Sequence, residues 1–281
     1  SFSKAADVMG NNQPNITRCM NILENELGCK LFIRSNRGVQ LTIEGERLFE
    51  HVSIAIEQLV SGENELLKDK GLESGLVNIG ASEIALHLFL LNELEVFHHH
   101  YPHVKLRISN HSTPQAVQAL ENGLVDFAVI STPVALKKPL QRIPLYSFHE
   151  ILIGGEEYAE MASKKHSLQE LQDIPLIGIA PGTSTRELYT QYFMRHNLPF
   201  SPDMEVATTD QILPMIQHNL GIGFLPEELA AEHIANGKIV QIPIVEPLPE
   251  RKICLIRNVK RPQSIAARSL EEHLTSHRET E

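Results

Sequence analysis

The first 28 residues hold two short helix signals separated by a tight polar turn. Ser3–Met9 has the composition of a short helix, Gly10–Gln13 of a polar turn, and Pro14–Leu27 of a longer helix that ends before a glycine. Asn12 is a suitable N-cap, and a proline in the first helical turn loses no hydrogen bond. Two helices joined by a tight turn are the reading unit of a helix-turn-helix, so this pattern predicts that motif.

The second helix has one apolar stripe and one polar end. Its apolar residues recur at spacings of four and three, which predicts an inward face made of Ile16, Met20, Leu23 and Leu27. The side chains left outside at its N-terminal end are Gln13, Asn15, Thr17 and Arg18. Residues of these types bond to base edges and phosphates from a helix in the major groove of DNA. A merely solvated polar face is the alternative interpretation.

A small hairpin follows the helix pair. Leu31–Arg34 and Val39–Thr42 are the expected strands, and Ser35–Gly38 is the turn between them. Arg34 and Arg37 lie at or near its tip, where guanidinium groups suit phosphate oxygens. The first 42 residues are therefore predicted to form a winged helix-turn-helix that binds double-stranded DNA.

These residues resemble a known family. The resemblance rests on spacing held across some forty residues, namely Ala5-Ala6, Gln13-Pro14, Arg18, Leu23-Glu24, Glu26-Leu27-Gly28, Leu31-Phe32, Arg34, Leu41-Thr42 and Gly45. This set is similar to the DNA-binding signature of the LysR-type transcriptional regulators. The resemblance implies DNA contacts by Gln13, Pro14, Thr17, Arg18 and Arg34. It also implies a further helix before Ser1, which we expect the complete protein to supply.

Charge and cysteine content fit an intracellular DNA-binding protein. The chain of 281 residues is long enough for about two domains. Its net charge is −10, but residues 1–41 carry +2. The acidic remainder would therefore repel DNA, whereas residues 1–41 would not. Cys19, Cys29 and Cys254 lack metal spacing and are expected to be reduced thiols. No signal peptide or membrane-length apolar run is present, so we expect a cytoplasmic protein with no membrane association.

A long helix should follow the hairpin. Residues 43–70 contain no proline, and apolar side chains repeat at spacings of four and three. The resulting seam consists of Leu48, Val52, Ala55, Leu59, Gly62 and Leu66, flanked by Phe49, Ile56, Val60 and Leu67. Its breadth predicts a linker helix that makes a homodimer or homotetramer. Burial of this seam against the chain's own DNA-binding domain is the alternative. Residues 71–75, with two glycines, are predicted to be a hinge.

Residues 76–281 alternate strand and helix patterns. The order strand, helix, strand, helix, strand in 76–130 implies a parallel sheet covered on both faces, and a second cycle begins near Leu176. We expect one lobe from residues 76–147 and 250–281 and another from 148–249. The arrangement resembles the two-lobed, periplasmic-binding-protein-like effector domain of the same family. The fold class is thus α/β with an N-terminal winged helix-turn-helix and a long linker helix.

Hydroxyl-rich segments follow several of the predicted strands. They are Ala81–Glu83, Ser112–Pro114, Ser131–Pro133 and Pro181–Thr185. Ligands of open α/β sheets sit at such ends, where helix N-termini offer N–H groups. We therefore expect a small polar or anionic effector to bind there. The family resemblance implies that Ser82, Thr113, Thr132 and Ser184 line this cleft, and we add the neighbouring Thr183. Simple helix capping explains any one of them equally well.

Catalytic and metal-binding patterns are weak. His98, His99, His100 and His103 cluster around Tyr101-Pro102, but neighbours on a helix point about 100° apart. The chain has no nucleophile elbow, P-loop or metal-binding His-Glu pair, so we predict no enzyme, no cofactor and no metal. The expected function is a sequence-specific transcriptional regulator controlled by a small-molecule effector. A solute-binding protein or a cleft enzyme of similar two-lobed fold is the alternative.

Overall fold

The computed structural model describes residues 1–35, 38–66 and 75–276. By its internal contacts the chain divides into two compact units, Ser1–Leu66 and Leu67–Glu281.

The first unit begins with the predicted helix pair. Helix α1 spans Phe2–Val8, and helix α2 spans Gln13–Leu27. The Asn12 side chain accepts the N–H of Asn15 as the N-cap, and Gly28 ends α2 in the left-handed region at φ 68°. A residue with a Cβ is strained at that φ, which explains why the helix ends at a glycine.

The inward stripe of α2 differs in part from the sequence prediction. Ile16 is buried, and Met20 and Leu23 are half-buried. Leu27 was predicted to face inward, but its side chain is 49% exposed. The buried residue in that turn is instead Glu24, whose carboxylate accepts a hydrogen bond from the backbone N–H of Leu31.

A two-stranded hairpin and a long helix complete the first unit. Strand β1 (Phe32–Ser35) pairs antiparallel with β2 (Gly38–Leu41), as the sequence predicts. Helix α3 follows at Ile43–Leu66. Its start packs tightly against the loop between α2 and β1, since a Cβ on Gly45 would lie 2.1 Å from the carbonyl oxygen of Leu31. The glycine of the family signature is therefore required for close packing.

Helix α3 carries a row of exposed apolar side chains. The exposed members of the predicted seam and its flanks are Phe49, Val52, Ala55, Ile56, Leu59 and Val60, with Leu59 at 70% exposure. Leu48 is half-buried. Gly62 lies within α3, whereas the side chain of Leu66, residue Leu67 and residues 71–74 of the predicted hinge lie outside the described part. Gly75 belongs to the first strand of the second unit.

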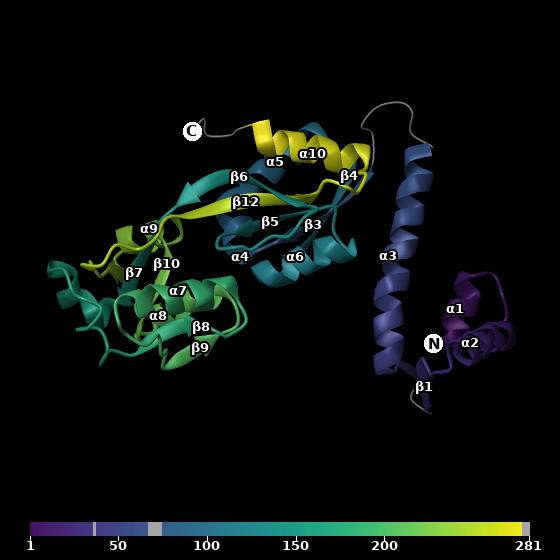
Figure 1. Ribbon diagram of the computed structural model, residues 1–281, viewed down its shortest axis with the longest axis horizontal. Helices are drawn as coiled ribbons and strands as arrows, with labels where there is room; N and C mark the ends of the chain where they lie inside the picture. Colours follow the sequence, from purple (N-terminus) through teal and green to yellow (C-terminus); the bar gives the residue numbers. More distant parts are fainter. Residues whose placement is uncertain (36–37, 67–74, 277–281) are drawn as a thin grey trace. The chain divides into compact units, whose positions relative to one another are not determined.

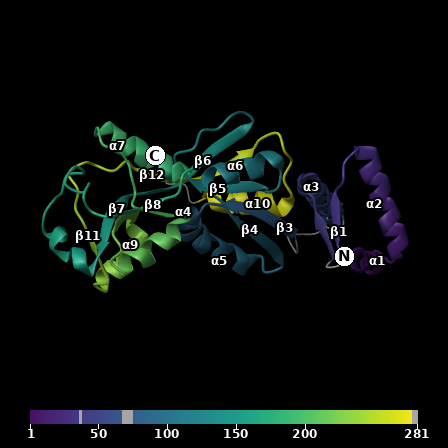
Figure 2. The ribbon, with the colours of Figure 1, turned by 90° about the horizontal axis from the view of Figure 1, so that it is seen from below.

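The second unit contains two five-stranded sheets, each the centre of one lobe (Figures 1 and 2). We call the lobe around the first of them the first lobe. Its strands, in spatial order, are β4 (Val104–Asn110), β3 (Gly75–Ala81), β5 (Phe127–Ser131), β12 (Arg251–Asn258) and β6 (Leu140–Phe148).

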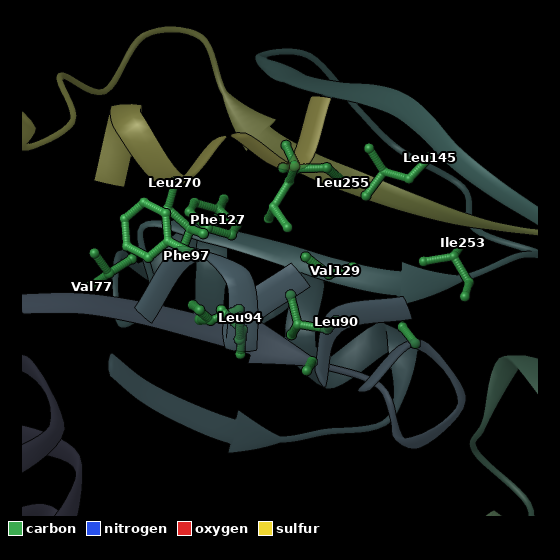
Figure 3. Close-up of a cluster of buried hydrophobic side chains, with 14 of the residues drawn as sticks. Val77, Leu90, Leu94, Phe97, Phe127, Val129, Leu145, Ile253, Leu255 and Leu270 are labelled. Carbon is green, nitrogen blue, oxygen red and sulfur yellow. The ribbon is translucent and has the colours of Figure 1, made fainter. Parts of the chain in front are cut away.

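Helices cover both faces of the first-lobe sheet. One face is covered by a continuous helical stretch, α4 (Glu83–Ala85), the π-helical η1 (Leu86–Leu90) and α5 (Leu91–His100), together with α10 (Ile265–Ser276). Figure 3 shows Leu90, Leu94 and Phe97 from this stretch and Leu270 from α10 gathered near Leu255 of the sheet. Helix α6 (Thr113–Asn122) covers the other face.

The second lobe repeats this plan. Its strands, in spatial order, are β11 (Ile239–Gln241), β7 (Glu150–Gly155), β10 (Ile222–Pro226), β8 (Leu176–Ile179) and β9 (Met204–Val206). One face packs on α8 (Ile212–Gln217) and α9 (Glu227–Ala235), and the other on α7 (Ser184–Arg195). Two 3-10 helices, η2 (Glu156–Ser163) and η3 (Thr209–Gln211), lie in this lobe.

Both sheets are mixed, and the prediction of parallel sheets was therefore incomplete. Strand β3 pairs parallel with β4 and β5, but β12 runs antiparallel to both β5 and β6. In the second lobe β7 is antiparallel to β10 and β11. Strands β6, β7 and β11 were not predicted from the sequence. The chain passes between the lobes at β6–β7 and again between β11 and β12. After each passage the next strand, β7 or β12, runs antiparallel to the parallel strands of the sheet that it joins.

Candidate nucleic-acid interface and ligand cavity

The polar end of α2 is exposed as the sequence predicts. Gln13, Pro14, Asn15 and Arg18 are exposed, and Thr17 is half-buried. The side-chain amide of Gln13 donates to the Thr17 hydroxyl at 3.1 Å. The helix N-terminus thus presents amide, hydroxyl and guanidinium groups together on one surface. Arg34 lies in β1 opposite Val39, but its side chain and the whole of Arg37 fall outside the described part.

A buried carboxylate ties α2 to the hairpin. Glu24 receives the Lys30 ammonium at 2.6 Å and the backbone N–H groups of Leu31 and Phe32 at 2.9 and 3.1 Å. The hydrogen bond from Lys30, followed by that from the Leu31 N–H, lowers the pKa of Glu24 to about 2. Glu24 therefore stays ionised and fixes the hairpin to the helix that presents Gln13.

A cavity of about 410 Å³ lies between the two lobes of the second unit. Residues from both lobes line it, including Ser82, Ser112, Thr113 and Ser131 from the first lobe and Pro181, Gly182, Thr183, Ser184, Thr185 and Thr208 from the second. The structure thus brings Ser82, Thr113, Thr183 and Ser184, four residues predicted from sequence, to one cavity. Segments separated by some hundred residues meet there.

Helix starts place these hydroxyls at the cavity. Ser82 caps α4, Thr113 is the first residue of α6, and Thr183 caps α7 by accepting the N–H of Arg186 at 3.1 Å. Capping and cavity lining are therefore compatible at Ser82 and Thr183. Backbone N–H groups at the starts of the longer helices α6 and α7 also favour negative charge nearby.

Thr132 is not placed at the cavity. Its hydroxyl accepts the backbone N–H of Lys252 at 2.9 Å, which joins the end of β5 to β12. The preceding residue, Ser131, lines the cavity instead. Neighbouring side chains of a strand point to opposite faces, so a one-residue difference separates the two roles.

A buried ion pair that the sequence does not predict lies beside the cavity. The Arg251 side chain is fully buried, and its Nη1 donates to Oε1 of Glu150 at 2.7 Å. Its Nη2 donates to the Ser131 hydroxyl at 3.0 Å and the Thr185 hydroxyl at 3.1 Å. Glu150 begins β7 and Arg251 begins β12, so the pair lies where the chain passes between the lobes.

A tyrosine completes this buried network. The Tyr189 hydroxyl of α7 donates to Oε2 of Glu150 at 2.5 Å. Burial, reinforced by the Glu150 charge, raises the pKa of Tyr189 well above its ordinary value. The phenol therefore stays protonated and remains a donor, so both Glu150 oxygens are satisfied. The only sequence signal for this network is that a charged residue begins each of these two strands.

The remaining chemical groups at the cavity are few. Glu83 lies at its edge, where one carboxylate oxygen is 2.8 Å from Nε2 of His87 and the other accepts the side-chain amide of Asn110. Among the described residues, no three His, Cys, Asp or Glu side chains are grouped as metal ligands. His98, His99 and His100 are exposed at the end of α5, and Cys254 is buried in β12. Within the described ranges no helix has the length and apolar character needed to cross a bilayer.

Comparison with known proteins assigns both units. Residues 1–46 match the model of the bacterial regulatory helix-turn-helix protein, lysR family, and residues 70–279 match that of the LysR substrate binding domain. The HTH-type transcriptional regulator BbuR of Bordetella bronchiseptica is 28% identical over 251 residues, which cover 89% of this chain and 76% of that protein. GltR of Bacillus subtilis, another regulator of this type, is 28% identical over 85% of this chain and 79% of its own length.

Solved structures share the fold. Full-length CbnR complexed with its target DNA has a TM-score of 0.76 at 18% identity, covering 99% of this chain and 94% of that one. The effector binding domain of QuiR in complex with shikimate has a TM-score of 0.63 at 17% identity, covering 73% of this chain and 97% of that domain. Together the two family models span nearly the whole sequence, and the chain therefore belongs to the LysR family of bacterial transcriptional regulators.

Proposed function

We propose that this LysR-type regulator reads DNA through the start of α2 and the hairpin, and responds to a small polar or anionic effector in the interlobe cavity. The DNA contacts are assigned to Gln13, Pro14, Asn15, Thr17, Arg18, Arg34 and Arg37. The effector contacts are assigned to Ser82, Thr113, Thr183 and Ser184. The protein acts in the cytoplasm, where its DNA is found.

The observation that carries the proposal is the polar lining of one cavity by both lobes. A ligand bound by side chains of both lobes interacts differently with each arrangement of the lobes, and only such a difference lets it shift an equilibrium. Family membership favours a regulator over a solute-binding protein or a cleft enzyme. The domain scheme that we propose is 1–42 for DNA, 43–70 for the linker helix, 71–75 for the hinge and 76–281 for the effector domain.

The exposed apolar row on α3 supports self-association. Phe49, Val52, Ile56, Leu59 and Val60 form a run that a second copy of the helix would bury. Two copies would bring two reading helices to a dyad-related site on DNA, as helix-turn-helix dimers do. We propose a homodimer or a homotetramer.

The test combines a DNA-binding assay with a metabolite screen. The purified protein should prefer fragments from its own promoter region over scrambled duplexes in a mobility-shift assay at physiological salt. At least one small acid should raise its unfolding temperature and change the shift. Equal binding to all duplexes would contradict the DNA assignment, and an acid that stabilises the protein without altering DNA binding would contradict effector control.

A further inference from the structure

The second lobe holds a cavity of its own, at the opposite end of its sheet from the interlobe cavity. Its volume is about 210 Å³. Strands β8 and β10 run parallel, and the interlobe cavity meets β8 where that strand ends, at Ile179. The other cavity meets the same two strands where they begin, at Leu176 and Ile222. We call it the second-lobe cavity.

Helix α7 extends from one cavity to the other. Thr183 caps the helix at the interlobe cavity, and Phe193 lies in its last turn at the second-lobe cavity. Ten residues of helix correspond to about 15 Å at roughly 1.5 Å per residue. Among the described residues, none lines both cavities. The second-lobe cavity is therefore a separate space, and its chemistry is considered independently of the interlobe cavity.

The floor of the second-lobe cavity is apolar and buried. Leu152 of β7, Phe193 of α7, and Ile222 and Phe224 of β10 are each 4% exposed or less. The rings of Phe193 and Phe224 meet edge to face, with their centroids 6.2 Å apart. Apolar walls favour an apolar occupant, and a cavity of about 150 Å³ with such walls can hold benzene. The volume here is therefore sufficient for one aromatic ring with a short arm.

The rim of the cavity is polar and carries a negative charge. Gln172, Ser201 and Asp203 line it and are exposed. The backbone of Leu176 holds Asp203 in place, because its N–H donates to Oδ2 at 2.8 Å and its carbonyl accepts the Asp203 N–H at 2.9 Å. Among the described residues that line the cavity, Asp203 alone is charged, and no cation in the described part of the chain pairs with it.

The charges around the rim favour a cation. Residues 148–249, which form the second lobe, hold 14 Asp and Glu against 5 Lys and Arg, a net charge of −9. Arg186 lies 5.0 Å from the centre of the Phe200 ring, but it is already paired with Glu205 at 2.5 Å. Arg195 is exposed at the end of α7 and does not line the cavity. A field of one sign attracts ligands of the opposite sign, so the lobe attracts cations.

We propose that the second-lobe cavity binds a small amine with an apolar body. The body lies against Phe193 and Phe224, and the ammonium group donates to the Asp203 oxygen that does not accept from Leu176. The cavity is smaller than the roughly 300–1,000 Å³ of sites for drug-sized ligands, so the ligand has about the size of an arylalkylamine. This inference goes beyond the proposed function and does not require that the interlobe cavity bind an effector.

Two probes with the same body and different heads test the site. Phenethylamine and phenethyl alcohol are titrated by calorimetry into the full chain at low and at high salt. The amine should bind about fivefold more tightly than the alcohol at low salt, because an exposed ion pair adds modestly to affinity. High salt should reduce this preference, because it screens the attraction between the ammonium group and Asp203.

A pair of charge variants tests the role of Asp203. Asp203→Asn removes the charge but keeps a side-chain oxygen for the N–H of Leu176, so the amine and the alcohol should bind to it about equally well. Asp173→Asn is the matched control, since Asp173 is an exposed acid of the same lobe that does not line the cavity. This change should leave the preference for the amine intact.

A pair of filling variants tests the location. Ile174 lines the second-lobe cavity and is half-buried, and Ala207 lines the interlobe cavity and is exposed. Ile174→Phe places a ring in the second-lobe cavity and should weaken the binding of both probes by at least about tenfold, because it occupies their space. Ala207→Phe adds the same ring to the interlobe cavity and should leave both affinities unchanged. Asp203→Asn keeps the proposal falsifiable should Ile174→Phe not fold.

Several results would overturn the proposal. Binding of the amine that stays undetectable up to about 10 mM would do so, since even a Kd of about 1 mM would be evident there. Equal affinities of the wild-type protein for the two probes would also do so. An equal loss of preference in Asp173→Asn, or a loss of binding in Ala207→Phe instead of Ile174→Phe, would place the amine elsewhere. None of these results affects the proposed function, which is tested by DNA binding and by acids.

Discussion

The Lys30 ammonium lies 2.6 Å from the carboxylate of Glu24, a residue that is only 3% exposed in the second helix of the DNA-binding motif. The same carboxylate accepts the N–H groups that begin the hairpin. One ionised side chain therefore joins the reading helix to the wing.

The first prediction concerns pH. The folded-state pKa of Glu24 is about 2, below its ordinary value of 4.5, so on acidification the unfolded chain takes up this proton first. The stabilisation is fully present above about pH 4.5 and is lost as the pH falls toward 2. Glu24→Gln should lower the unfolding temperature at pH 7, and the difference from wild type should shrink between pH 4.5 and 2. A difference that does not vary with pH would contradict this account.

The second prediction concerns base preference. Gln13→Ala should weaken binding to the preferred site by about 1–3 kcal/mol per lost base contact while affecting scrambled DNA less. Selection of binding sites from random duplexes by the wild type and the variant measures this directly. Asn25→Ala, an exposed change nearer the C-terminal end of the same helix, serves as the control and should leave the preference unchanged. Equal losses on both kinds of DNA would remove Gln13 from base reading.

The third prediction concerns a phosphate contact. Arg34→Ala should weaken binding to all sequences and reduce the slope of log K against log salt by roughly 0.9 per phosphate in each protomer. Fluorescence anisotropy titrations at several salt concentrations give this slope. Arg268→Ala removes an exposed arginine from α10 and should leave the slope as it is in the wild type. A slope unaltered by Arg34→Ala would exclude that role.

The fourth prediction concerns self-association. Leu59→Glu places a charge in the exposed apolar row of α3 and should weaken the dimer by roughly 100-fold or about 2.7 kcal/mol, because a charge buried without a partner is costly. Gln58→Glu adds the same charge one position away and should have little effect. Analytical ultracentrifugation over a concentration series measures the dissociation constant. A dimer that tolerates both changes equally would place the interface elsewhere.

Local signals in the sequence were sufficient for most of the secondary structure. The N-cap Asn12 and the terminal Gly28 bracket α2 as predicted, and the hairpin β1–β2 follows where the sequence predicts it. Each of these features depends on residues a few positions apart. The resemblance to the LysR family, based on such short-range spacing, is confirmed by both family models.

Features that depend on distant residues could not be predicted in this way. Pairing of Glu150 with Arg251 joins residues 101 positions apart, and neither residue type is usually buried. The choice of Ser131 over Thr132 depends on which face of β5 meets the cavity. A sequence pattern shows that the side chains of a strand alternate between its two faces. It does not by itself show which of the two faces meets the cavity.

Strand β12 has a consequence for the order in which the protein can be built. It lies between β5 and β6, although more than a hundred residues of the second lobe separate it from them along the chain. On the ribosome, both of those strands emerge with an open edge and keep it until residues 251–258 have been synthesised, and such edges invite aggregation. The second lobe, whose strands are contiguous in sequence, can fold in the meantime. The first lobe, although its synthesis begins earlier, is therefore completed after the second lobe.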